Sequence, residues 1–79
     1  MRASVTRDGR VYFQGDRVDP EELPARIRGA VGEGAERKIY ANIDGRARNG
    51  DVEVMLDAIR ASGITRLAIM STRDIVIHR

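Results

Sequence analysis

The stretch from Lys38 to Thr72 constrains the fold of this chain most, because its hydrophobic pattern changes period within a few residues. Residues 37–43 alternate between polar and apolar side chains, which predicts a strand with one buried face. Residues 52–59 then place apolar side chains at helical spacing, at Val52, Met55, Leu56 and Ile59. This spacing predicts an amphipathic helix that begins near residue 50 and ends at residues 62–63, where serine and glycine follow each other.

A continuous apolar run over residues 67–70 follows this helix. Such a run is typical of a central strand that is buried on both faces. Strand, helix and strand in this order predict a βαβ unit, in which the two strands are parallel and adjacent.

The first half of the chain predicts a hairpin and another helix. Residues 5–13 read as two short strands around Asp8-Gly9, a pair typical of a two-residue turn. A second turn at residues 14–16 leads to Val18, which we interpret as an isolated apolar anchor. Asp19, Pro20 and Glu22 predict a helix start with a capping box.

This first helix presents one apolar face and ends at two glycines. The face consists of Leu23, Ile27, Ala30 and Val31. Pro24 removes an early backbone donor, so we expect an irregular first turn. Gly32 and Gly34 predict the end of the helix.

These elements predict a two-layer α+β fold: a small mixed sheet of four to five strands with two helices on one face, in the order ββαβαβ. A last short strand over residues 75–77 is the optional fifth. The chain has 79 residues and no cysteine, so we expect residues 1–79 to form a single domain around one core.

No catalytic, metal-binding or cofactor-binding set is predicted. Gly45 to Gly50 has the spacing of a phosphate-binding loop, but Asp51-Val52 follows where lysine and a hydroxyl residue are required. The glycines around Glu33 follow a helix rather than a strand, so they are not a dinucleotide motif. His78 lies beside the C-terminus, and we interpret it as a tail residue.

The polar loop after residue 43 leaves several interpretations open. Asp44 and Asp51 can organise the turn and open the next helix, or they can act as general acid and base in a small hydrolase; the structural role is favoured. Arg46, Arg48 and Asn49 lie beside a helix N-terminus, where an anion or a sugar polymer can bind, or they form an ordinary solvated loop.

The basic residues also allow two interpretations. The chain carries 14 Lys+Arg against 12 Asp+Glu, a net charge of +2, and Lys38 is its one lysine. The arginine excess reflects either a GC-rich genome or a real anionic partner. The alternative function is therefore a small basic α/β module that binds nucleic acid in the cytoplasm. Few aromatic residues and interleaved acids speak against it.

The chain resembles the soluble domain of the ExbD/TolR family of biopolymer transport proteins over most of residues 4–72. The resemblance is carried by the IYANID strand that ends at Asp44, the NGDVEVMLDAIRASGI helix and the TRLAIMST strand. It implies the periplasmic domain of a bacterial inner-membrane single-pass protein, and we expect the transmembrane helix to be absent from this chain. It also implies a non-enzymatic role in coupling proton motive force to transport or envelope maintenance.

The partners that the resemblance implies are an ExbB/TolQ-like membrane protein, a TonB/TolA-like periplasmic protein and peptidoglycan, with no nucleic acid. The candidate contact residues for a partner or for peptidoglycan are Asp44, Arg46, Arg48 and Asn49. We also expect a homodimer, because the core is thin and a small sheet has open edges. The candidate edges are the hairpin and residues 75–77.

Overall fold

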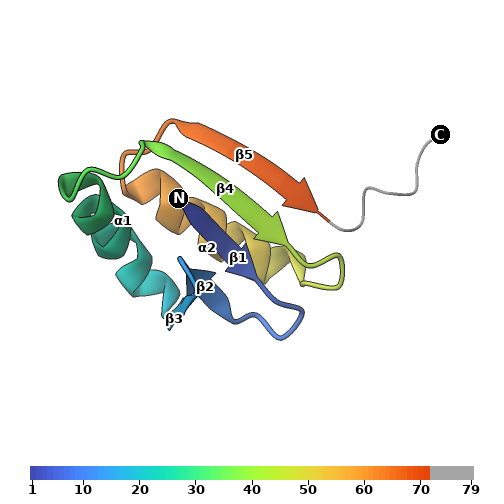
Figure 1. The fold of residues 1–79 in the computed structure, drawn as a ribbon. Helices are drawn as coiled ribbons and strands as arrows, with labels where there is room; N and C mark the ends of the chain where they lie inside the picture. The colour runs from blue at the N-terminus through green and yellow to red at the C-terminus, as the bar shows by residue number, and fades with distance from the viewer. Residues whose placement is uncertain (72–79) are drawn as a thin grey trace.

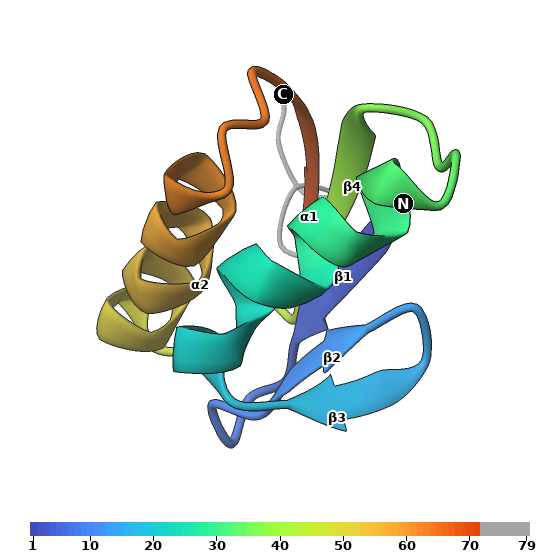
Figure 2. The same cartoon turned by 90° about the vertical axis from the view of Figure 1, so that its left-hand side faces the viewer.

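A mixed sheet forms one layer of the protein and two α-helices form the other (Figure 1). The computed structural model describes residues 1–71. Its strands are β1 (Arg2–Val5), β2 (Val11–Phe13), β3 (Asp16–Val18), β4 (Lys38–Ile43) and β5 (Arg66–Ser71). Its helices are a short 3₁₀ turn, η1 (Pro20–Glu22), followed by α1 (Leu23–Gly32) and α2 (Asn49–Ala61). Figure 2 shows both α-helices on the same side of the sheet, which confirms the predicted two-layer α+β class.

The strand order within residues 1–71 is β3-β2-β1-β4-β5. The β1–β2 and β2–β3 pairs are antiparallel, whereas β4 is parallel to both β1 and β5. The predicted βαβ unit is therefore present as β4, α2 and β5. The N-terminal strand β1 occupies the centre of the sheet, with Ala3 opposite Ala41 of β4 and Phe13 of β2.

The core lies between the sheet and the helices, as the alternating pattern predicts. Each strand from β1 to β4 turns its apolar residues towards α1 and α2, and these helices contribute the apolar residues of one stripe each. The buried residues are Ala3, Val5, Val11, Phe13, Val18, Leu23, Ile27, Ile39, Ala41, Ala47, Met55 and Ile59.

The ends of the helices follow the local sequence. The Glu22 carboxylate accepts a hydrogen bond from the Asp19 backbone N–H at 3.3 Å, which is one half of the predicted capping box. The first turn is the 3₁₀ turn η1, so the irregularity predicted from Pro24 is present. At the other end of α1, Gly34 has a φ of 101°, and the Ala35 N–H donates to the Ala30 carbonyl at 3.0 Å. This is a Schellman ending, which requires a residue that tolerates positive φ.

Two details of the predicted sheet are corrected. Val18 is not an isolated anchor, because it ends the three-residue strand β3, which pairs with β2. The order is therefore βββαβαβ within residues 1–71. The hairpin of β1 and β2 is consequently not at an edge, since β3 covers one side of it and β4 the other.

The prediction that residues 67–70 form a central strand buried on both faces is wrong. Among the described residues β5 pairs with β4 alone, so it lies at the sheet edge. Ile69 is 51% exposed and Met70 is 46% exposed, because a strand with a neighbour on one side is covered less completely. The predicted strand at residues 75–77 and the interpretation of His78 lie outside the described residues.

Candidate functional site

The polar loop between β4 and α2 begins with a turn that Asp44 organises. The Asp44 N–H donates to the Val5 carbonyl at 3.1 Å, which joins the loop to the end of β1. The Asp44 carboxylate accepts a hydrogen bond from the Arg46 backbone N–H at 2.8 Å, and the Ala47 N–H donates to the Asp44 carbonyl at 2.9 Å. Asp44 thus has the turn-forming role that the structural interpretation predicts.

Ala47 fixes this loop to the core and turns its neighbours outward. Its side chain is buried although it lies between two arginines, whereas Arg46 and Arg48 are exposed. Arg48 precedes α2 in an extended conformation, with a φ of −75° and a ψ of 144°, and exposed Asn49 is the first residue of the helix. The four predicted contact residues therefore lie in one short segment.

Asp51 lies in the first turn of α2 and faces the β1–β2 turn rather than the loop. A Cβ atom built on Gly9 would lie 2.6 Å from the Asp51 Oδ2 atom, so the Asp51 carboxylate lies close against the Gly9 backbone. Gly9 has a φ of 82°, which glycine adopts readily. Asp51 interacts favourably with the positive end of the helix dipole, whereas the N-cap residue, Arg48, makes no side-chain cap hydrogen bond. Asp44 and Asp51 thus contact different neighbours.

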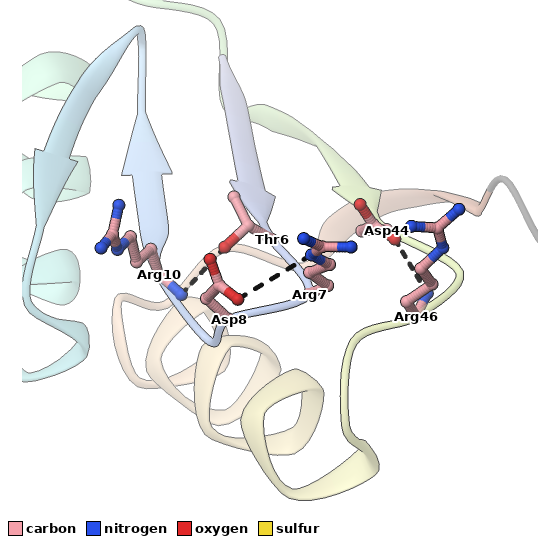
Figure 3. A network of polar contacts seen from close by, with 6 residues as sticks. All are labelled: Thr6, Arg7, Asp8, Arg10, Asp44 and Arg46. Atoms are coloured by element: carbon pink, nitrogen blue, oxygen red, sulfur yellow. Dashed lines mark hydrogen bonds and ion pairs between the residues drawn. The ribbon is translucent and has the colours of Figure 1, made fainter.

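The β1–β2 turn lies at the same end of the sheet as this loop, as Figure 3 shows. The Arg10 backbone N–H donates to the Thr6 hydroxyl oxygen at 3.2 Å and closes the turn. The Arg7 Nε atom lies 3.9 Å from the Asp8 carboxylate, and both side chains are exposed, so this ion pair contributes little to stability. Bases and acids alternate at this end, which gives it no single sign of charge.

The chemistry available at this end is surface recognition. Within residues 1–71 every charged or polar side chain is at least partly exposed, and no three potential metal ligands gather. Exposed guanidinium groups can bind carboxylates, and the Asn49 amide can hydrogen-bond to sugar hydroxyls. An open hollow lies next to Asp44, lined also by Ser4, Asn42 and Met70. Sequence reasoning missed Met70 here, because it assigned that residue to a buried strand.

The comparisons with known proteins give the family. The family described as "Biopolymer transport protein ExbD/TolR" matches residues 1–74. The chain therefore belongs to the ExbD/TolR family of biopolymer transport proteins. It is 29% identical over 70 residues to the biopolymer transport protein ExbD of Pseudomonas aeruginosa strain PAO1, an alignment that covers 89% of this chain. The alignment covers 53% of the relative, so the chain spans about half the length of that protein. No helix within residues 1–71 is long and apolar enough to cross a membrane.

Proposed function

We propose that this chain is the periplasmic part of a longer, inner-membrane-anchored protein that couples proton motive force to transport or envelope maintenance. Family membership supports the role in biopolymer transport, and the match to about half of the relative supports a longer parent protein. In this proposal the domain is not an enzyme. It contacts a TonB/TolA-like periplasmic protein, while the membrane anchor contacts an ExbB/TolQ-like protein.

The observation that carries a contact role for this domain is the exposed edge strand β5. Among residues 1–71 it pairs on one side only, and two large apolar side chains, Ile69 and Met70, are about half exposed. An edge strand of six residues is long enough to accept another extended chain through backbone hydrogen bonds. We propose that a second copy of this chain pairs here, which gives a homodimer.

Sedimentation equilibrium of the wild type and two variants tests the homodimer. Ile69→Lys places a charge at the proposed contact and should shift the population towards monomer. Val54→Lys is the matched control, because Val54 is 50% exposed on α2, and this variant should associate like the wild type. A wild-type domain that stays monomeric at high concentration, with its native flanking residues present, would overturn the proposal.

The genomic reading frame upstream of Met1 tests the anchor. The proposal requires one apolar segment of about 20 residues there, the length that spans a bilayer. A single aspartate within that segment agrees with proton transfer, since ionisable residues inside a membrane are costly and mark functional sites. A reading frame that begins at Met1 would contradict the anchored protein.

Peptidoglycan is the second proposed contact, through Asp44, Arg46, Arg48 and Asn49. The exposure of the two arginines and of Asn49 supports it. A pull-down on isolated peptidoglycan should retain the wild type and lose the Arg46→Ala/Arg48→Ala variant. The matched control is Arg26→Ala/Arg60→Ala, which removes two exposed arginines from α1 and α2. Equal retention of both variants would remove the loop as the contact site.

A further inference from the structure

The sheet face opposite the helices carries an unbalanced charge. Residues on this face alternate with the buried ones, so the register of the strands identifies them. In Figure 1 this face is turned towards the viewer, with α2 behind it. The residues on it are Arg2, Ser4, Tyr12, Arg17, Lys38, Tyr40, Asn42, Arg66, Ala68 and Met70. Four of these strand residues are bases and none is an acid; Asp44 follows β4 and lines a hollow with Ser4, Asn42 and Met70 at the carboxyl end of the parallel strands.

Three of these bases occupy the same position in neighbouring strands. Arg2, Lys38 and Arg66 are the first residues of β1, β4 and β5, the three mutually parallel strands. We call them the amino-end triad. Lys38 lies directly opposite Arg66 in the register, and Arg2 lies opposite Tyr40. The amino ends of parallel strands lie at one end of a sheet, so the triad concentrates positive charge there.

The charge of this face is a property of the fold rather than of composition. Residues 1–71 contain 12 bases and 11 acids, and four of the bases but none of the acids belong to the strand residues of this face. No ion pair joins the triad or Arg17 to an acid among the described residues, whereas Arg26 and Arg60 on the helices pair with Asp16 and Asp57. A uniform arginine bias would not separate the charges in this way.

Tyrosines accompany the bases. The Lys38 Nζ atom lies 4.9 Å from the centroid of the Tyr40 ring, and Tyr40 is 37% exposed. Half-buried Tyr12 lines a shallow hollow on the same face with Arg2, Ser4 and Asn42. A tyrosine side chain has an apolar ring and a polar tip, a combination that suits the boundary between water and lipid.

We propose that this face, through the amino-end triad, binds the headgroups of anionic phospholipids at the membrane surface. The inference rests on the proposed function, which places the domain beside the inner membrane with an anchor upstream of β1. The triad lies at the end where β1 begins, and therefore at the end of the sheet nearest such an anchor. The end of the sheet that carries the triad can bring several bases to a negatively charged surface at once, and each base near that surface adds about fivefold to partitioning.

Co-sedimentation of the full chain with vesicles tests the proposal. Vesicles of phosphatidylglycerol and phosphatidylcholine should bind the protein, vesicles of phosphatidylcholine alone should not, and salt should weaken the binding. The variant Arg2→Gln/Lys38→Gln/Arg66→Gln should bind about a hundredfold more weakly. The control Arg26→Gln/Arg28→Gln/Arg60→Gln removes three exposed arginines from α1 and α2 and should bind like the wild type.

A second pair of variants distinguishes weaker binding caused by lost charge from weaker binding caused by misfolding. Arg2→Gln/Arg66→Gln preserves the contact between Lys38 and the Tyr40 ring and should weaken vesicle binding about thirtyfold. Arg2→Lys/Arg66→Lys keeps the charge and should retain binding. Circular dichroism spectra that match the wild type show that each variant is folded.

Three results would overturn the proposal: no binding of the wild type to the phosphatidylglycerol vesicles, equal losses in the triad and control variants, or tighter triad-dependent binding to single-stranded RNA than to vesicles. The homodimer test is separate, because it depends on Ile69 and not on the triad. Failure of vesicle binding with an intact dimer would therefore reject this inference and leave the proposed function standing.

Discussion

The contact between Gly9 and Asp51 predicts that Gly9→Ala destabilises the protein in two separable ways. The φ of 82° at Gly9 belongs to the left-handed region, which costs a residue with a Cβ atom about 1–2 kcal/mol. The new Cβ atom would also lie 2.6 Å from the Asp51 Oδ2 atom, so the carboxylate must move. Because this carboxylate belongs to a side chain that can rotate, the second cost is that of a displaced rotamer, about 0.5–1.5 kcal/mol.

Gly15 is the matched control for the backbone cost of a positive φ. It has a φ of 89°, and a Cβ atom there would meet nothing within 4 Å. Gly15→Ala should therefore show the backbone cost alone, whereas Gly9→Ala should lower the free energy of unfolding by about 1 kcal/mol more, because it also displaces the Asp51 carboxylate. In a domain of this size that difference corresponds to about 4–8 °C in Tm.

A double-mutant cycle measured by urea denaturation isolates the contact. Asp51→Ala removes the carboxylate and costs about 0.3–1 kcal/mol through the helix dipole. In the Gly9→Ala/Asp51→Ala variant the clash is absent, so the cost of Gly9→Ala should fall to that of Gly15→Ala. Equal costs for Gly9→Ala with and without Asp51 would refute the argument that the β1–β2 turn packs against the start of α2.

Two further predictions concern the core and the loop. Met55→Ala should lower the free energy of unfolding by about 2–5 kcal/mol, because the side chain is fully buried under the sheet. Val54→Ala, at the exposed neighbouring position, should change it by less than about 0.5 kcal/mol. Thermal denaturation of both variants measures the difference. Asp44→Ala should lower the free energy of unfolding by about 0.5–1.5 kcal/mol through loss of the hydrogen bond from the Arg46 N–H. Asp44→Asn keeps an acceptor oxygen and should lower this free energy by less. Similar losses of stability in both variants would contradict the turn-forming role.

Local patterns were sufficient to predict the helices and the longer strands. Met55 and Ile59 recur at helical spacing, and Ile39 and Ala41 alternate with polar residues, so their burial follows from the sequence. β3 has three residues, too few to show a period. The position of β5 at the edge depends on what lies beside it in space, which an apolar run of four residues does not encode.

Only part of the candidate site could be predicted, because some of its contacts are local in sequence and others are not. The turn at Asp44 is local, since an aspartate accepts a hydrogen bond from the backbone two residues later. The approach of Gly9 to Asp51 joins residues that are far apart in the chain, and no local signal marks it. Ala47 offered a weak signal, as a small apolar residue between two arginines in an otherwise polar loop.

The central place of β1 has a consequence for how the protein folds as it is synthesised. The Met1 amino group donates to the Lys38 carbonyl at 2.8 Å across a separation of 37 residues. At a synthesis rate of about 5–20 residues per second, β4 leaves the ribosome about 2–7 s after β1. During that interval β2 can pair with one side of β1, while the other side, where β4 will lie, stays unpaired. The nascent chain therefore presents a temporary strand edge at the position that becomes the interior of the finished sheet.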